Sequence, residues 1–163
     1  MTIETEIKII NKFAVEKESR DFYNYITHLN LVNDLNEFLV LPARRHFFYS
    51  EEEILKFRGI VNVSKLNYIS KIDVFMRKIN VLVKRDSYFF GCFINNKYFS
   101  YPRFKETRHS FSKFIYAIKL LIDSKMKRLM SENDVKRMFE TYEFEIVNMK
   151  EIRGVTYFYA KKK

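Results

Sequence analysis

The sequence contains few of the residues that interrupt regular structure: three glycines and two prolines occur among its 163 residues. Collagen-like and linker-rich chains have far larger shares of both residues, so these classes are excluded. The scarcity of glycine also argues against a glycine-rich phosphate-binding loop, in which the backbone must approach the ligand closely. Cys92 is the only cysteine, so no disulfide can form within the chain and nothing indicates an oxidising compartment.

The sequence also lacks long apolar runs and familiar catalytic motifs. No run approaches the roughly 20 residues of a membrane-spanning helix, and no cationic stretch followed by an apolar one opens the chain as a secretory signal would. We therefore expect a cytoplasmic protein, and peripheral attachment to the inner face of the membrane stays open. No serine-hydrolase elbow, P-loop, zinc-protease motif or metal-ligand spacing occurs, so the sequence predicts neither a catalytic residue nor a metal site.

Apolar residues, in contrast, are abundant. Hydrophobic residues make up 47% of the chain and aromatic residues 17%, a composition too apolar for a disordered protein. A chain of 163 residues buries about 70% of its unfolded surface in one core without a metal or disulfide. We therefore predict a single domain that spans residues 1–163.

Positive charge is concentrated in the second part of the chain. Residues 1–58 carry 8 basic and 10 acidic side chains, whereas residues 59–163 carry 22 basic and 10 acidic ones. This asymmetry suggests an anionic partner, which could be a nucleic acid, a phosphorylated substrate or an anionic membrane surface. A solvated lysine-rich surface explains the same charge equally well.

Apolar periodicity predicts alternating helices and strands in the first half. Ser19 is the expected cap of a first helix, and residues 37–41 read as a short buried strand. Residues 59–94 read as strand, helix and strand, with Ser70 and Asp73 as a capping box for the helix. This order predicts a βαβ crossover and hence a parallel sheet.

The second strand of that crossover, YFFGCFI at residues 88–94, is the strongest strand in the sequence. It is continuous and apolar, as expected for a strand that is buried on both faces of a sheet. Cys92 lies in its middle, so we expect a buried, unreactive thiol rather than a nucleophile.

Two helices and a hairpin are predicted in the second half. Ser110 is the expected cap of the first helix, whose apolar side runs from Phe111 to Leu129, and the second helix begins at Ser131, which forms a capping box with Asp134. Residues 144–160 then read as two strands joined by a short turn that contains glycine, and residues 161–163 as a frayed basic tail.

The order of these elements resembles the C-terminal part of a class I S-adenosylmethionine (SAM)-dependent methyltransferase. GIVNV at 59–63 corresponds to the fourth strand of that fold and YFFGCFI at 88–94 to the fifth. The phrase MSENDVKRMFETYEFEIVNMKEIRGVTYFYAKK is similar to the ending of those enzymes, a helix followed by a hairpin. The resemblance implies an α/β fold with a mainly parallel sheet and a C-terminal antiparallel hairpin, which is a methyltransferase-like, Rossmann-like domain.

A narrower resemblance covers roughly residues 19–160. The segments NEFLVLPARRHFFY, IVNVSKLNYISKIDVFMRKINVLVKRDSYFFGCF and EFEIVNMKEIRGVTYFYAKK are similar to a bacterial module found beside, or fused ahead of, membrane sugar-phosphate transferases of exopolysaccharide assembly. This resemblance implies an accessory role in cell-envelope polysaccharide synthesis, with a membrane sugar transferase as the partner.

The chain departs from the methyltransferase pattern where that pattern binds its cofactor. No glycine precedes Gly59, so the glycine-rich turn after the first strand is missing, and no acidic residue clearly closes a second strand to hold a ribose. Arg85, Asp86 and Ser87 stand where a pair of glycines usually precedes the fifth strand. We therefore expect no cofactor and no catalysis. An active SAM-dependent or other small-molecule transferase with an unrecognised cofactor site is the alternative.

Arg44, Arg45 and His46 form one candidate anion-binding site. They follow the predicted strand at 37–41, and open α/β sheets bind ligands beyond the carboxyl ends of their strands. Two guanidinium groups can hold a phosphate through paired hydrogen bonds. Two solvated arginines beside a helix start are favoured over this site, because no second element of a site is visible.

Residues 95–128 form a basic and aromatic segment, with nine basic and two acidic residues. A solvated basic helix face is favoured, an anionic membrane surface comes second, and single-stranded nucleic acid comes third because no nucleic-acid motif is present. If the segment docks on an anionic surface, the side chains expected to provide the attraction are those of Lys113, Lys119, Lys125, Lys127 and Arg128.

Overall fold

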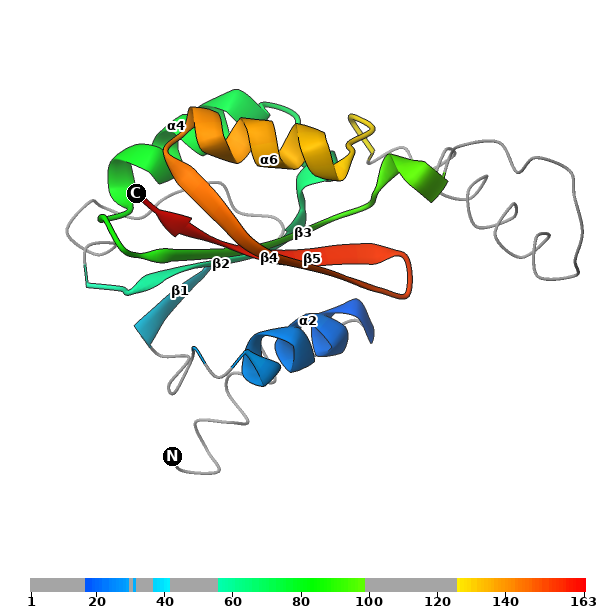
Figure 1. Cartoon of the computed structure of the whole chain (residues 1–163), viewed down its shortest axis with the longest axis horizontal. Coiled ribbons are helices and arrows are strands. Elements are labelled where there is room, and N and C mark those ends of the chain that lie inside the picture. The colour runs from blue at the N-terminus through cyan, green and yellow to red at the C-terminus, as the bar shows by residue number, and fades with distance from the viewer. Residues whose placement is uncertain (1–16, 30, 32–36, 42–55, 99–125) are drawn as a thin grey trace, which may run out of the picture.

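The computed structural model describes residues 17–29, 31, 37–41, 56–98 and 126–163. Within these residues, five strands form one mixed sheet with helices on both of its faces (Figure 1). The strands are β1 (Phe38–Leu41), β2 (Gly59–Lys65), β3 (Tyr88–Phe93), β4 (Phe144–Ile152) and β5 (Val155–Lys162).

The sheet has the strand order β1-β2-β3-β5-β4. β1, β2 and β3 run parallel to one another, whereas β5 is antiparallel to both of its neighbours, β3 and β4. β4 therefore points in the same direction as the three parallel strands. The predicted βαβ unit is confirmed, as is the α/β class with a mainly parallel sheet and a C-terminal antiparallel hairpin. The hairpin lies beside β3, the second strand of that unit.

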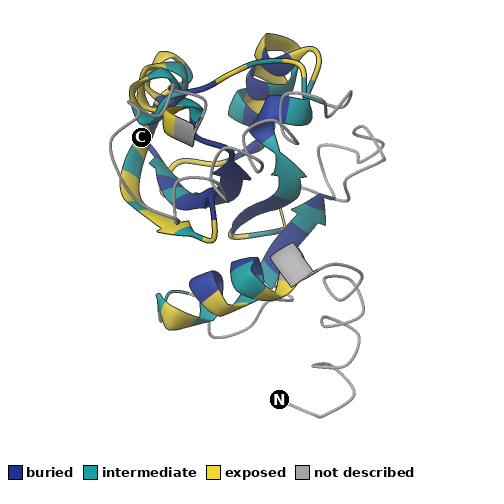
Figure 2. Cartoon of the chain, turned by 90° about the vertical axis from the view of Figure 1, so that its right-hand side faces the viewer, coloured by how far each residue is buried: buried dark blue, intermediate teal, exposed yellow. Residues whose placement is uncertain are grey.

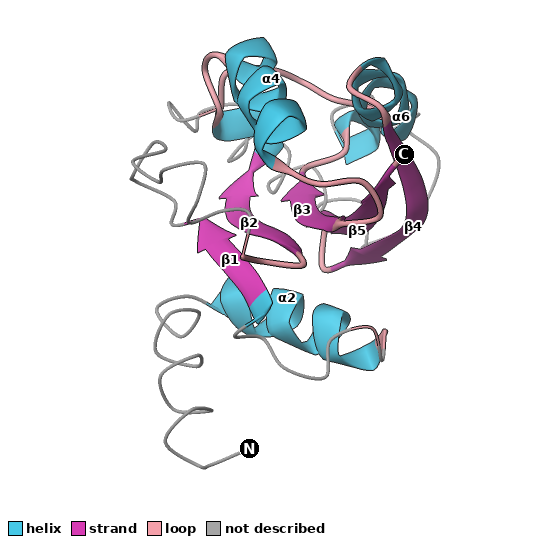
Figure 3. Cartoon of the chain, turned by 90° about the vertical axis from the view of Figure 1, so that its left-hand side faces the viewer, coloured by secondary structure: helices cyan, strands magenta, loops and turns pink. Residues whose placement is uncertain are grey.

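The helices are divided between the two faces of the sheet (Figure 3). α2 (Lys17–His28) covers one face, and α4 (Ile72–Leu82) and α6 (Glu132–Thr141) cover the other. Two short 3₁₀ helices, η2 (Leu66–Tyr68) and η3 (Asn96–Tyr98), follow the ends of β2 and β3. Figure 2 shows that the middle of the sheet is buried, while exposed residues lie on the helices, the turns and the edge strand β4.

β3 is the centre of the molecule because its side chains alternate between two apolar cores. Phe89 and Phe93 pack in the core under α4 and α6, whereas Phe90 and Cys92 pack in the core under α2. Cys92 is buried, as its position in the strand predicts. Gly91 lies in this strand because there is no room for a side chain: an added Cβ would stand 2.7 Å from the Phe158 ring.

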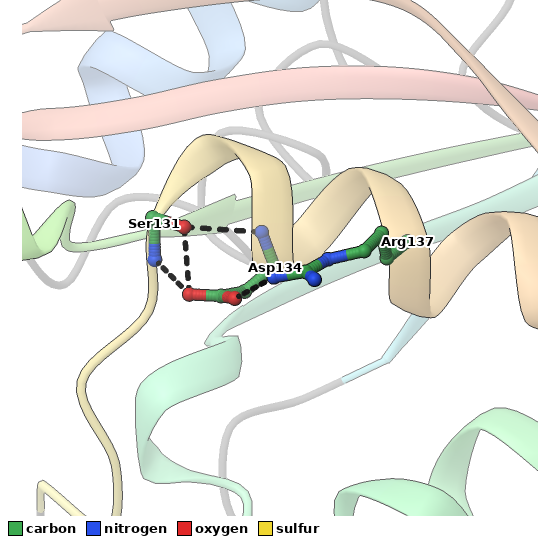
Figure 4. Close-up of polar contacts among 3 residues, drawn as sticks. All are labelled: Ser131, Asp134 and Arg137. Atoms are coloured by element: carbon green, nitrogen blue, oxygen red, sulfur yellow. Dashed lines mark hydrogen bonds and ion pairs between the residues drawn. The ribbon is translucent and has the colours of Figure 1, made fainter.

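The capping box predicted at the start of α6 is present (Figure 4). The Asp134 N–H donates to the Ser131 hydroxyl oxygen at 3.1 Å, and the Ser131 N–H donates to the Asp134 carboxylate at 2.9 Å. The Ser131 hydroxyl donates to the same carboxylate, and Arg137 contacts its other oxygen at 2.9 Å. These contacts, led by the Ser131 hydroxyl, hold the pKa of Asp134 below its usual value.

Removing the cap should weaken this helix measurably. We expect Ser131→Ala to lower the free energy of unfolding by about 1 kcal/mol, because the Asp134 N–H loses its acceptor and the Asp134 side chain loses a donor. Urea denaturation followed by circular dichroism measures the change. Ser131→Thr keeps the hydroxyl and should stay close to the wild type; an equal loss in both variants would contradict the capping explanation.

Two other predicted caps are wrong. α2 begins at Lys17, so Ser19 lies inside the helix rather than before it. The residue that precedes α4 is Lys71, which makes no side-chain capping bond, so Ser70 and Asp73 do not form a capping box. The two helices themselves are present as predicted, because burial of an apolar side, rather than the cap, positions each of them.

The predicted ends of two other elements are also wrong. Leu129 was expected on the apolar side of a helix, but it lies in a non-helical stretch and is 51% exposed. Lys161 and Lys162 were expected in a frayed tail, but both belong to β5. The Lys162 side chain is buried beside the ring of Phe144, and its ammonium donates to the Glu143 carboxylate at 2.8 Å. A lysine can therefore be the buried last residue of a strand when a carboxylate forms an ion pair with its ammonium group.

The longest helix in the described segments has 12 residues. None of the helices there has the length and apolar character needed to cross a bilayer.

Candidate functional site

The carboxyl ends of β1, β2 and β3 meet at one edge of the sheet, because the three strands are parallel. Ligands of open α/β sheets bind beyond such an edge, so it is the candidate functional site. At β2 the pairing with β3 slips: Val61 lies opposite Phe90, and the next partners are Lys65 and Cys92. The residues between these pairs form an irregularity of the kind that redirects side chains near functional sites.

Asn62 lies in this irregular stretch and is only 2% exposed. Its side-chain amide donates to the carbonyl oxygen of Ser64 at 2.8 Å. This bond is local, so the amide of Asn62 stabilises the distorted end of β2 itself.

Asn67, in η2, is completely buried and ties three segments together. Its amide group donates to the carbonyl oxygen of Ile94 at 3.0 Å, and its carbonyl oxygen accepts from the Ile94 N–H at 2.7 Å. The same amide also donates to the carbonyl oxygen of Arg128 at 3.1 Å, while the Asn67 backbone carbonyl accepts from the Lys127 N–H at 2.8 Å. We call this set of contacts the Asn67 clamp.

Residues 126–130 lie across the end of β3 as a consequence of the clamp. Asn95 and Met130 form a parallel β-bridge, and the Asn96 N–H donates to the Met130 carbonyl oxygen at 2.7 Å. The chain thus returns to the carboxyl edge of β3 before α6 begins.

Asn95, Lys97 and Glu132 form a polar cluster beside this bridge. The Asn95 amide donates to the Glu132 carboxylate at 2.9 Å, and the Asn95 side-chain oxygen accepts from the Lys97 N–H at 3.2 Å. The Lys97 ammonium contacts the carboxylates of Glu132, at 3.7 Å, and of Glu151. The hydrogen bond to Glu151 raises the pKa of Lys97, which favours its charged form.

The side-chain amides at this edge form hydrogen bonds to other parts of the chain. Neither Asn67 nor Asn95 fits the role of a cofactor contact, because both ends of each amide already bond to the chain. The described residues also contain no group of three or more His, Cys, Asp or Glu side chains that could hold a metal ion. The amides of Asn67 and Asn95 therefore hold the described part of this edge together through bonds within the chain.

The turn before β3, where the methyltransferase pattern has two glycines, is built differently. Asp86 adopts a left-handed backbone conformation (φ 64°) that glycine usually supplies. The Asp86 N–H donates to the Lys162 carbonyl oxygen at 3.0 Å, and its carboxylate pairs with Lys161 at 2.7 Å. The hydrogen bond and the charge of Lys161 lower the pKa of Asp86. The turn is thus held by the end of β5 instead of being left open by glycine.

Most of the predicted site residues lie outside the described residues. These are Arg44, Arg45 and His46 of the anion-binding candidate and Lys113, Lys119 and Lys125 of the basic segment.

The two described members of the basic segment behave differently from each other. Lys127 is exposed, but its backbone belongs to the Asn67 clamp. The guanidinium of Arg128 donates to the carbonyl oxygens of Ser70 at 3.0 Å and Ile69 at 3.4 Å, while its Nε is buried without a hydrogen-bond partner. Arg128 therefore fastens residues 126–130 to the chain just before α4.

Sequence reasoning missed Asn67, Asn95 and Lys97. The signal available was the position of the two asparagines just after strands β2 and β3, where open α/β sheets place their ligand contacts. Their bonding partners could not have been read from the sequence, because Asn67 and Arg128 lie far apart along it.

No family model and no curated protein matches the chain. Several solved structures are similar to it. A possible exported protein from Bordetella parapertussis shares 12% identity at a TM-score of 0.50, over 65% of this chain and 39% of that one. An O-methyltransferase family protein from Burkholderia thailandensis shares 9% identity at a TM-score of 0.47, over 73% of this chain and 36% of that one.

A SAM-dependent methyltransferase from Thermotoga maritima, described as a possible histamine N-methyltransferase, shares 11% identity at a TM-score of 0.44, over 66% of this chain and 56% of that one. The chain therefore spans less than two thirds of the length of each of these proteins. At such low identity the likeness concerns the fold alone. The order and directions of β2, β3, β5 and β4 agree with the methyltransferase-like ending that the sequence resembles, so the chain has a methyltransferase-like α/β fold.

Proposed function

We propose that this chain is a methyltransferase-like domain without catalysis of its own, and that it acts as an accessory protein in cell-envelope exopolysaccharide synthesis. The observation that carries the first half of the proposal is the Asn67 clamp. It occupies the carboxyl edge of β2 and β3, the place where an open α/β sheet would bind its ligand, with bonds from the chain to itself.

The sequence supports the same conclusion independently. No glycine precedes Gly59, so the close approach of backbone to cofactor that the methyltransferase pattern uses after its first strand is missing. The turn before β3 is closed by Asp86 and the end of β5 rather than by glycine. The chain thus lacks glycine at both turns where the methyltransferase pattern uses it.

The second half of the proposal rests on the resemblance of three segments to a module associated with membrane sugar-phosphate transferases. The proposed partner is such a transferase, and the proposed location is the inner face of the membrane. The net charge of +10 supports this location, because the cytoplasmic leaflet is anionic.

Calorimetric titration with SAM tests the absence of catalysis. We expect no saturable heat up to millimolar ligand, the regime of about 4 kcal/mol in binding free energy, because the Asn67 and Asn95 amides are already occupied. S-adenosylhomocysteine should behave in the same way, which controls for cofactor breakdown. A micromolar dissociation constant for either ligand would refute the proposal in favour of an active SAM-dependent transferase.

A further inference from the structure

α4 carries apolar side chains on two opposite sides, and only one of them is needed for the fold. Ile72, Met76 and Ile79 face the sheet and are buried. Val74 and Val81 lie on the outer side and are 42% and 73% exposed, respectively. A separation of seven residues places these valines above one another on the helix surface. Val81 is the most exposed large apolar residue in the described segments.

Basic residues surround the two valines. Arg77 and Lys78 are exposed and lie between Val74 and Val81, one on each flank of the line that joins them. We call these four residues the outer stripe of α4. Residues 71–85 contain five basic side chains and one acidic one. The next carboxylate along the chain, that of Asp86, already pairs with Lys161.

All four residues of the outer stripe are exposed. The helix lies flat over the sheet beside α6, so that its long side, rather than its end, faces outward (Figures 1 and 3). An interfacial helix presents itself to a bilayer in the same orientation.

We propose that the outer stripe of α4 docks the protein onto an anionic phospholipid surface. Arg77 and Lys78 meet the headgroup phosphates, and the two valines reach the boundary of the acyl chains. Val74 and Val81 distinguish this surface from a nucleic-acid site, because aliphatic side chains contribute little to phosphate binding. Bases stack on exposed rings, and the one ring of α4, that of Phe75, packs against the core.

This inference does not depend on whether the domain binds a cofactor. Vesicle binding can therefore be absent while SAM also fails to bind, and SAM can bind while the outer stripe still docks on vesicles. It also concerns a surface other than the basic segment at 95–128. The two surfaces can be separated experimentally, because the residues of the outer stripe are exposed and can be changed without disturbing the core.

Co-sedimentation with vesicles tests the proposal. We expect the protein to bind vesicles of equal parts phosphatidylglycerol and phosphatidylcholine but not vesicles of phosphatidylcholine alone. Arg77→Gln with Lys78→Gln should lower the partition coefficient about tenfold, because each basic side chain near an anionic leaflet contributes separately. Val74→Ser with Val81→Ser should lower it about fivefold. Raising the salt from about 0.1 M to about 1 M shortens the screening length from roughly 10 Å to 3 Å and should release the protein.

Matched variants on β4 and at the residue that follows β5 serve as controls. Val147→Ser replaces a valine of β4 that is 51% exposed, and Lys150→Gln with Lys163→Gln removes two exposed charges. Both controls should bind like the wild type. The proposal is overturned if the wild type ignores anionic vesicles, or if the stripe variants bind as well as the controls. Fluorescence polarisation with a single-stranded oligonucleotide completes the test. The proposal is also overturned if the stripe variants lose binding to the oligonucleotide but keep binding to vesicles.

Discussion

Asn67→Ala is expected to lower the free energy of unfolding by about 3 kcal/mol. The substitution removes three hydrogen bonds and leaves the N–H and carbonyl of Ile94, at the buried end of β3, without their partner. Each buried polar group that loses its partner costs about 1–3 kcal/mol. Chemical denaturation followed by circular dichroism measures the loss.

The same variant should also release residues 126–130 from the end of β3. Trypsin cleaves after lysine and arginine, so we expect faster cleavage after Lys127 and Arg128 in the variant than in the wild type. Asn133→Ala is the matched control, because Asn133 is an exposed asparagine on α6. If Asn67→Ala loses less than about 1 kcal/mol and is cleaved no faster, the clamp does not close this edge of the sheet.

Phe89→Ala should have an even larger effect, a loss of about 4 kcal/mol. Phe89 is completely buried, and its ring centroid lies 5.2 Å from that of Phe139 and 6.1 Å from that of Phe158. Its removal leaves a cavity where β3, β5 and α6 meet, and a buried phenylalanine truncated to alanine typically costs about 3–5 kcal/mol. Urea denaturation gives the change in stability.

Phe89→Leu provides the comparison, because it keeps most of the apolar volume while losing the ring contacts. We expect it to lose about 1.5 kcal/mol, well under half of the effect of alanine. Equal losses in the two variants would show that ring geometry, rather than filled volume, stabilises this core.

Much of the fold could be predicted because its signals are local. The apolar run of β3, the spacing of Ile72, Met76 and Ile79 on α4, and the pairing of Ser131 with Asp134 each involve residues within a few positions of one another. Patterns of this kind specify helices and strands directly. The order of those elements then restricts the sheet to a few topologies, of which the observed one is an example.

The features that could not be predicted depend on contacts between distant residues. Asn67 resembles an ordinary turn residue in the sequence, and only its contacts with Ile94 and Arg128 show its role. Lys162 resembles part of a solvated tail, because lysine is rarely buried unless a partner such as Glu143 is present. The candidate site was therefore less predictable than the fold, since polar residues gain their roles from partners rather than from periodicity.

The pairing of β3 with β5 has a consequence for how the chain folds. Each of these strands belongs to a local unit, β2-α4-β3 or α6-β4-β5, but the residues that pair between the units lie 63 (Phe93 and Thr156) to 73 (Tyr88 and Lys161) positions apart. Closing so long a loop costs entropy before any non-local contact compensates for it. We therefore expect the junction of β3 and β5 to limit the folding rate, so that substitutions there slow folding itself. Substitutions at the contact between α2 and the sheet, once the sheet has formed, should instead speed unfolding.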